Sequence, residues 1–442
     1  MLENYTSKGT DFCSCNYKTQ KPEILSPAGD FEKLQVAISY GADAVYIGGK
    51  QFSLRANTKN FDMEDLQRAI DYAHSNNVKV YVAANIFAHN QDLDGLPEYL
   101  QSLKNIGADA VIVADLGIFD VARQVQGLEI HISTQANVTN YQSAKLYKSL
   151  GAKRVILARE LSFAEIRKIN DEVSDGSFQT EVFAHGAMCV SYSGRCLLSS
   201  YMAGRDSNQG DCAQPCRWKY NLVEELRPGE YLPVYENERG TYIMNSKDMC
   251  LAQHIPELVA CGAGSLKIEG RMKSAYYVAV TTGIYRQAVD DFFADPKLYE
   301  SKKAYYVNEL QKTSHREYFT GFYIDGALTN LTQSRDGQLN VPAQTYHTNT
   351  YTSTCEFLGL VTDYSNGYAI IEQRNKFSVG DQVEFIKSGH KQTITEMYNE
   401  KGQLIESAPH AQEKIRVKVD IQLTRFDIMR KVLFTNEICN NL

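Results

Sequence analysis

The stretch Gly41-Ala42-Asp43-Ala44-Val45-Tyr46-Ile47-Gly48 decides the architecture of this chain. It joins a Gly-Ala step to a short run of small and β-branched apolar residues. Similar steps precede three more apolar runs, at 107–109, 151–153 and 262–264. Glycine at such a step suits the end of a helix, and a run of Ala, Val and Ile suits a parallel strand buried on both faces. Each unit therefore predicts a helix end followed by a strand.

Eight apolar runs of this kind occur before residue 270, and amphipathic stretches with helical spacing separate most of them. The predicted strands are Glu23–Pro27, Ala44–Gly48, Lys79–Ala84, Ala110–Ala114, Glu129–Thr134, Arg154–Ala158, Thr180–Ala184 and Ser265–Ile268. The predicted helices are Phe31–Tyr40, Met63–Asn76, Leu96–Ile106, Tyr141–Leu150 and Phe163–Glu172. Eight strands with helical crossovers favour a (β/α)8 TIM-like barrel. The alternative, an open doubly wound sheet, lacks the expected G-x-G-x-x-G after its first strand.

The rest of the chain divides by composition. The predicted segments are a flexible polar tail at 1–21, the barrel at 22–330, a linker at 331–353, a small antiparallel β-barrel domain at 354–430 and a second tail at 431–442. A long cysteine-bearing insertion at 189–264 separates the seventh and eighth strands and is expected to distort the barrel. Alternating apolar and polar residues with Asn-Gly and Gly-Asp turns indicate the C-terminal strands.

Length and charge exclude several classes of protein. The 442 residues exceed one small domain, and the net charge of −7, from 46 basic and 53 acidic residues, argues against a protein that coats nucleic acid non-specifically. A local basic patch remains compatible with RNA binding. No run of about 18 apolar residues predicts a membrane span, and residues 1–20 lack the apolar core of a signal peptide. We therefore expect a cytoplasmic protein without a membrane partner.

Four of the ten cysteines fall within 28 residues, in the pattern C-x6-C-x15-C-x3-C. They are Cys189, Cys196, Cys212 and Cys216, with Cys250 as a reserve ligand. Such a group in a cytosolic chain indicates metal binding. The x6 gap fits two close zinc knuckles poorly, so we favour a [4Fe–4S] cluster over zinc; four unlinked buried thiols are the third reading. The seventh strand ends just before Cys189, which would put the metal over the barrel mouth.

Polar residues at the strand ends are the candidates for catalysis and substrate binding. The catalytic candidates are His185, Glu181, Lys267 and Glu269, and the substrate-binding candidates are Arg55, Arg159, Arg271, Asn137 and Tyr46. In Lys267-Ile268-Glu269-Gly270-Arg271 the three charges alternate, so they share one face of a strand. They would meet an anionic substrate or form a structural ion network with Glu181. His185 is either a general acid/base or a core histidine.

Cations and aromatic residues lie close to the cysteines. Arg205, Arg217, Trp218 and Lys219 combine charge with a stacking face, which suits contact with phosphates and bases. The alternative for each of them is a solvated surface.

Several long motifs of this chain resemble peptidase family U32. They are Ile24-Leu25-Ser26-Pro27-Ala28-Gly29-Asp30, Ala42-Asp43-Ala44-Val45-Tyr46-Ile47-Gly48, Glu181–Cys189, Ser193-Gly194-Arg195-Cys196, Asn245-Ser246-Lys247-Asp248 and Lys267-Ile268-Glu269-Gly270-Arg271. The resemblance runs from about residue 22 to 430. Within the family the chain is most similar to bacterial tRNA hydroxylation proteins, which form 5-hydroxyuridine at the wobble position.

The resemblance implies an iron–sulfur cluster on the four cysteines, prephenate as the source of the hydroxyl group, and tRNA as the substrate. Arg55, Lys267 and Arg271 would hold this small anionic co-substrate, while His185 and Glu181 would handle protons. A paralogous U32 subunit or a second copy would add basic surface. Hydroxylation of another RNA or of a small aromatic substrate is the nearer alternative.

The family name points to a second class of function, a collagenase-like peptidase. The sequence offers it little support, because no Ser-His-Asp set can be placed and no H-E-x-x-H motif occurs. A cysteine peptidase would need one reactive thiol beside a histidine, and not four gathered thiols.

Overall fold

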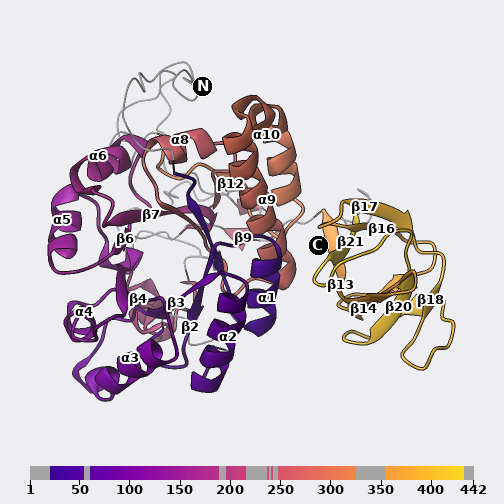
Figure 1. Ribbon diagram of the computed structural model, residues 1–442, viewed down its shortest axis with the longest axis horizontal. Coiled ribbons are helices and arrows are strands. Elements are labelled where there is room, and N and C mark those ends of the chain that lie inside the picture. The colour runs from indigo at the N-terminus through magenta and orange to yellow at the C-terminus, as the bar shows by residue number, and fades with distance from the viewer. Residues whose placement is uncertain are drawn as a thin grey trace.

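The computed structural model describes residues 20–53, 60–188, 196–215, 236–237, 240–241, 247–324 and 354–432. Within them, eight parallel strands close into a barrel, which confirms the predicted TIM-like fold (Figure 1). The barrel strands are β1 (Glu23–Pro27), β2 (Ala44–Gly48), β3 (Lys79–Ala84), β4 (Ala110–Val113), β5 (Glu129–Ile132), β6 (Arg154–Ile156), β7 (Gln179–Ala187) and β11 (Ser265–Ile268). The last strand, β11, pairs with both β7 and β1 and so closes the ring.

Helices surround the barrel on its outside (Figure 1). They are α1 (Phe31–Ser39), α2 (Met63–Ser75), α3 (Leu96–Asn105), α4 (Leu116–Ala122), α5 (Tyr141–Ser149), α6 (Phe163–Val173), α8 (Ile255–Ala260), α9 (Ala275–Ala294) and α10 (Pro296–Leu310). The Gly-Ala steps end helices as predicted, because Gly41, Gly107, Gly151 and Gly262 all have positive φ angles between 84° and 104°. None of the described helices is long and apolar enough to cross a bilayer.

Strand β7 carries more than its two barrel neighbours. Beyond the barrel it pairs antiparallel with β10 (Asp248–Cys250), which in turn pairs with β12 (Tyr318–Phe319). The register between β7 and β11 shifts at this point, so that Phe183 faces Lys267 but His185, two residues on, faces Ile268. This β-bulge turns the end of β7 relative to the barrel, and Ala187 at the end of β7 is the Cα partner of Asp248 at the start of β10.

The C-terminal domain is an antiparallel sheet curved into a half-barrel. Its strand order is β17-β16-β21-β13-β14-β20-β18, so β17 and β18 are the edges of this seven-stranded sheet. The strands are β13 (Cys355–Ser365), β14 (Tyr368–Gln373), β16 (Gln382–Phe385), β17 (His390–Thr393), β18 (Met397–Tyr398), β20 (Lys414–Lys418) and β21 (Ile428–Val432). The predicted turns at Asn366-Gly367 and Gly380 adopt positive φ. A separate apolar core, including Leu358, Ile371 and Phe385, fills the sheet.

The described residues also include two further pairs of short strands. They are β8 (Glu236–Asn237) with β9 (Gly240–Thr241), and β15 (Phe377–Ser378) with β19 (Ser407–Ala408). The predicted linker at 331–353 lies outside the described residues, as do nearly all of the two predicted tails.

A buried arginine joins the two domains. Arg430 of β21 is 1% exposed and donates hydrogen bonds to Glu309 of α10 at 2.6 Å and to Glu384 of β16 at 2.8 Å. Beside it, the ring of Tyr276 in α9 stacks on Phe357 of β13, with centroids 5.7 Å apart. The half-barrel is therefore fixed to the outer helices of the barrel.

Candidate active site

The interior of the barrel holds a buried network of charges. Lys267 of β11 donates to Glu181 of β7 at 2.9 Å, and Arg154 of β6 donates to the other oxygen of Glu181 at 3.1 Å. Arg154 also donates to Glu23 of β1 at 2.6 Å. Glu181 is fully buried, and Arg154 and Lys267 are each 5% exposed. Two cations thus face two carboxylates, which is the arrangement that buried charges require.

Neutral groups complete this network around Glu23. Tyr81 donates to one Glu23 oxygen at 2.7 Å and Ser265 donates to the other at 2.8 Å. Burial raises the pKa of Glu23, but the charge and hydrogen bonds of Arg154 and the two hydroxyl donors outweigh it and hold the pKa below its usual value. The carboxylate is therefore the stable form.

The position of the network bears on its role. Glu23, Arg154 and Ser265 are the first residues of their strands, so the network lies toward the N-terminal end of the barrel. Barrel enzymes work at the opposite end. Glu181 and Lys267 thus occupy the structural ion network that the sequence left open, and their predicted catalytic roles stay predictions. Glu23 and Arg154 were not among the residues predicted from sequence. A charged residue at the first position of an apolar strand is a signal that could have indicated them.

Tyr46 lies one level above the network. Its hydroxyl donates to the Ile268 carbonyl at 2.9 Å, and the ammonium of Lys267 lies 4.3 Å from its ring centroid. The ring supplies a cation–π contact for a buried charge. Tyr46 therefore packs against the ion network and joins β2 to the end of β11.

Arg271 organises the mouth near β2. Its guanidinium donates to the Ser53 hydroxyl at 3.0 Å and to the Asn60 side-chain oxygen at 2.9 Å. It lies so close to Gly48 that a Cβ there would come within 2.2 Å of Nη2. Ser53 and Asn60 flank residues 54–59, so one guanidinium joins both ends of that segment. Arg55, a predicted substrate contact, lies within 54–59 and outside the described residues.

Arg159 and Asn137 follow the neighbouring strands β6 and β5. Arg159 donates to the Ala187 carbonyl at 2.8 Å and lies 5.1 Å over the Phe183 ring. Its Nε, and Oδ1 of Asn137, are buried without a hydrogen-bond partner among the described residues. Asn137 also adopts a left-handed backbone, with φ of 55°. Buried polar atoms without partners are costly, so this donor and this acceptor suit a bound polar molecule.

His185 lies in the core beside the barrel. The β7 bulge brings it into register with Ile268, and its ring contacts those of Tyr277, Tyr285 and Tyr318 at centroid distances of 5.3 to 5.9 Å. Burial lowers the pKa of His185 to about 3, with His315 and Lys273 adding to the effect. The imidazole is therefore neutral at pH 7. Its Nε2 is buried and has no hydrogen-bond partner among the residues that the structure describes.

Glu269 lies just past the end of β11 and touches the same region. Its amide donates to the His185 carbonyl at 2.9 Å, and its carbonyl accepts from the Tyr277 hydroxyl at 2.8 Å. Because β11 ends at Ile268, the alternation of side chains along a strand does not extend to Glu269 and Arg271. The three charged residues therefore do not share one face of a strand, although the sequence predicted that they would. Lys267 lies in the ion network, Glu269 lies beside His185, and Arg271 lies at the mouth near β2.

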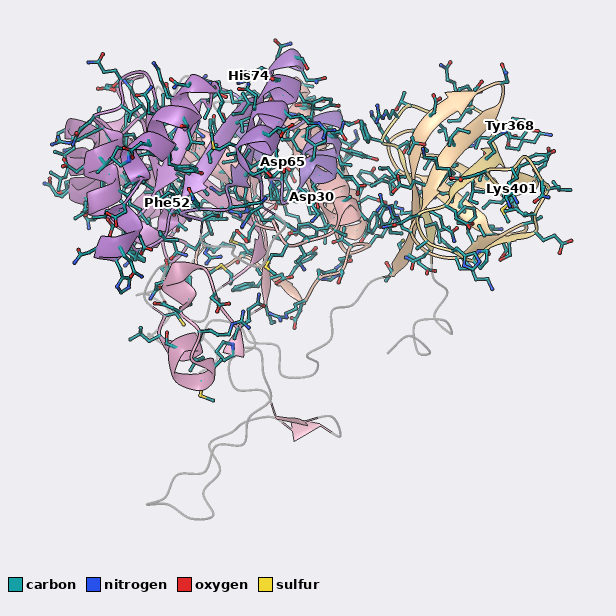
Figure 2. The ribbon with its side chains drawn as sticks, turned by 90° about the horizontal axis from the view of Figure 1, so that it is seen from below. Asp30, Phe52, Asp65, His74, Tyr368 and Lys401 are labelled. Atoms are coloured by element: carbon teal, nitrogen blue, oxygen red, sulfur yellow. The ribbon has the colours of Figure 1, made fainter. Side chains whose placement is uncertain are left out.

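Two of the four clustered cysteines fall in the described segment 196–215. Cys196 precedes α7 (Leu198–Ala203), and its carbonyl accepts from Ser207 at 2.8 Å. The Ala213 amide donates to Ser199 of α7 at 2.9 Å, which ties the neighbour of Cys212 to the same helix. The Phe87 amide, beyond the end of β3, donates to the Asn208 carbonyl at 3.2 Å. The segment therefore rests on the mouth of the barrel, and Figure 2 shows α7 projecting from it.

Cys212 has a feature that suits a metal ligand. Its Sγ accepts a hydrogen bond from the Gln214 amide at 3.4 Å, and Gln214 adopts a left-handed φ of 56° to make it. Hydrogen bonds to the ligand sulfurs are among the factors that tune iron–sulfur clusters. Cys196 and Cys212 are both partly exposed free thiols, whereas Cys189 and Cys216 lie outside the described residues. No group of three metal-binding side chains occurs among the residues that are described.

The reserve ligand Cys250 belongs to a different element, strand β10. It lies in β10 as the cross-strand partner of His185, and burial raises its pKa to about 11, with a hydrogen bond to the Ala252 backbone and Tyr285 opposing the shift. Its thiol is thus protonated and packed toward α9.

The predicted RNA contacts are only partly described. Arg205 forms an ion pair with Asp211, with Nη2 to Oδ1 at 2.6 Å, so part of its charge is used within the segment. Arg217, Trp218 and Lys219 lie outside the described residues.

Comparison with known proteins agrees with these observations. Residues 29–333 match the model of peptidase family U32, and residues 353–430 match that of the family's C-terminal domain. The chain is 38% identical to tRNA hydroxylation protein P1 of Bacillus subtilis, across 93% of this chain and 95% of that protein. It is 36% identical to tRNA hydroxylation protein P of Escherichia coli, across 95% and 99%.

Another relative carries a different name. A Methanocaldococcus jannaschii protein called an uncharacterized protease is 48% identical across 68% of this chain and 73% of its own. The two family models cover the barrel and the half-barrel in turn, and the bacterial relatives align with nearly the whole chain. The chain belongs to peptidase family U32.

Proposed function

We propose that this protein is an RNA hydroxylase that forms 5-hydroxyuridine at the wobble position of tRNA. The observation that carries the proposal is the alignment of 93–95% of the chain with two proteins named for tRNA hydroxylation. The seating of the segment containing Cys196 and Cys212 on the barrel mouth supports it, because that is where barrel enzymes act.

The proposal includes a [4Fe–4S] cluster held by Cys189, Cys196, Cys212 and Cys216. The amide donor to Cys212 and the accessible thiol of Cys196 fit such a group. Zinc on the same four thiolates is the alternative. When bound, the cluster would supply electron transfer or activate an oxygen atom.

The residues of the mouth suit a small anionic co-substrate, for which we propose prephenate. Arg271 and Arg159 supply cationic groups, and Asn137 supplies an acceptor for a hydroxyl. Replacing C5–H of uridine by C5–OH is a two-electron oxidation. The overall reaction balances if the co-substrate gives up its hydroxyl group, so that its C–OH becomes C–H while the uridine C–H becomes C–OH.

The remaining partners follow from charge. A chain with a net charge of −7 binds RNA only through local basic surface. A second copy or a paralogous U32 subunit would add to that surface. A tRNA substrate would be met in the cytoplasm, and a cytoplasmic location is part of this proposal.

The test combines metal analysis with nucleoside analysis. The protein purified without oxygen is expected to be brown, to show a broad visible absorbance band, and to contain matching iron and sulfide. Cys196→Ala should lose the cluster and the 5-hydroxyuridine formed from tRNA and prephenate. The matched control Cys261→Ala, at a buried thiol outside the segment, should keep both. Colourless protein containing zinc would refute the cluster assignment. If tRNA incubated with the cluster-loaded protein and prephenate contained no 5-hydroxyuridine, the proposed reaction would be refuted.

The peptidase alternative can be examined at the cross-strand pair Cys250 and His185. They face each other across β10 and β7. A cysteine peptidase needs a thiolate beside a protonated histidine, but the pKa of Cys250 is raised to about 11 and that of His185 is lowered to about 3. The pair is therefore held in the unreactive forms. Peptide hydrolysis that survived Cys196→Ala would favour this alternative.

A further inference from the structure

The outer face of strand β20 in the half-barrel is unusually rich in cations. Residues 414–418 read Lys-Ile-Arg-Val-Lys; Ile415 and Val417 are buried in the domain core, whereas Lys414, Arg416 and Lys418 are exposed. Side chains of a strand alternate between its faces, so the three cations form one row. None of the residues predicted for catalysis or binding lies in this domain.

Two tyrosines flank the middle of the row. Arg416 is the Cα partner of Tyr398 on β18, and Tyr368 of β14 pairs with Lys418. The Arg416 guanidinium lies 4.5 Å from the ring centroid of Tyr368 and 5.4 Å from that of Tyr398. The two rings lie 6.0 Å apart at an interplanar angle of 70°. An arginine that packs against two neighbouring aromatic rings presents a positive charge beside a stacking surface.

Glu396 holds this arrangement in place. It accepts hydrogen bonds from the hydroxyls of Tyr398 at 2.6 Å and Tyr368 at 2.8 Å, and it pairs with Lys418 at 3.3 Å. The hydrogen bond from Tyr398 is the main reason that the pKa of Glu396 falls to about 2. The carboxylate thus stays ionised and orients both rings before any ligand arrives, which reduces the entropy that binding would cost.

We propose that Tyr368, Tyr398, Arg416, Lys414 and Lys418 form a platform that binds unpaired nucleotides of the RNA substrate. Bases stack on tyrosine rings and on arginine guanidinium planes, and lysines beside them contact phosphates. The inference rests on the proposed function, since it takes the ligand to be RNA. It gives an acidic chain the local basic surface that RNA binding requires.

The location of the platform adds a property. Figure 2 labels Tyr368 on the part of the half-barrel remote from the barrel. The nucleotides on the platform are therefore different from the base that enters the barrel mouth. The half-barrel acts as a second point of attachment for an extended RNA, and two linked contacts bind more tightly than either alone.

The test measures tRNA binding by the full chain with fluorescence anisotropy. Arg416→Ala and Tyr368→Ala are each expected to weaken binding about tenfold, as loss of one stacking contact does. Arg416→Ala should also lower the salt slope of log K by about 0.7, because the guanidinium charge, besides its stacking plane, neutralises about one phosphate of the bound strand. Arg416→Lys keeps the charge without the plane, so it should restore the slope but not the full affinity.

Matched controls separate the platform from general effects. Lys391→Ala removes an exposed cation from β17, the opposite edge of the same sheet, and Tyr305→Ala removes an exposed tyrosine from α10. Both should change affinity less than twofold. Tyr368→Phe keeps the ring and should retain most of the affinity, which guards against an unfolded alanine variant.

The outcomes distinguish this inference from the proposed function. If the wild-type protein binds tRNA and forms 5-hydroxyuridine while Arg416→Ala and Tyr368→Ala bind tRNA as tightly, the platform is refuted and the function stands. If double-stranded RNA competes as well as single-stranded RNA, stacking is refuted. If the wild-type protein neither binds nor hydroxylates tRNA, the proposed function itself fails.

Discussion

Replacing Arg154 by methionine should destabilise the barrel strongly, and in a way that depends on pH. Methionine preserves much of the side-chain volume but removes every charge-assisted bond that Arg154 donates to Glu23 and Glu181. Two buried carboxylates are then left with Lys267 as the remaining cation of the network. Removing one partner of a buried ion pair costs about 3–5 kcal/mol.

This cost converts into a shift of the melting temperature. An unfolding entropy of about 2.1 cal/mol/K per residue gives about 0.6 kcal/mol/K for a barrel of about 300 residues, so the expected loss is about 5–8 °C at pH 7. Arg123→Met is the control, because Arg123 pairs with Asp120 at 2.6 Å with both side chains about half exposed. That surface pair should contribute less than about 1 kcal/mol.

The pH dependence supplies the sharper signature. In the wild-type protein the pKa of Glu23 is lowered, so its stabilising contribution is complete above about pH 4.5 and is lost as the pH falls further. In Arg154→Met burial acts without the arginine and raises the pKa of Glu23, so the variant gains stability as the pH falls from 7 toward 4.5.

The difference between the two proteins should therefore narrow on acidification. Thermal unfolding followed by circular dichroism between pH 4.5 and 7.5 measures it. A loss below 2 °C at pH 7, or a loss that is equal at both ends of the pH range, would refute the role assigned to the network.

Three further changes test other parts of the structure. Gly48→Ala would place a Cβ within 2.2 Å of the Arg271 guanidinium and should lower the hydroxylation rate at least tenfold without unfolding the chain. The control Gly264→Ala has more room, with 3.4 Å from the new Cβ to its nearest neighbours, and should be active. Equal hydroxylation rates in the two variants would contradict this prediction. Tyr285→Phe removes a hydroxyl that donates to one buried carbonyl and accepts from one buried amide, so urea unfolding should show a loss of about 1–3 kcal/mol; an unchanged midpoint would argue that these groups find other partners. Arg430→Met should cost about 3 kcal/mol and speed proteolytic release of the half-barrel, and a cleavage rate equal to that of the wild type would show that apolar packing alone holds the domains together.

The barrel could be predicted from sequence because each strand is short, apolar and followed by its own helix. The left-handed glycines at 41, 107, 151 and 262 mark the helix ends directly, since only glycine adopts that conformation cheaply. Helix α4, at Leu116–Ala122, was not predicted because its seven residues make only two turns.

The candidate site was predicted less well, because its contacts join distant strands. Arg154 opens β6 and Glu23 opens β1, and nothing in either local pattern shows that they meet at 2.6 Å. The β7 bulge likewise leaves no mark in composition, yet it moves His185 into a cluster of tyrosines. Arg416 was missed because its partner rings lie on two other strands.

The pairing of Ala187 with Asp248 has a consequence for the history of this chain. The long excursion that carries the cysteines leaves the barrel and returns to it at adjacent positions, one strand spacing apart. Its ends are already closed by the ladder, so doubling its length would cost only about 0.6 kcal/mol in loop entropy. The cysteine-bearing segment can therefore lengthen, shorten or be replaced while the barrel beneath it stays the same, which gives one scaffold room to acquire new substrates.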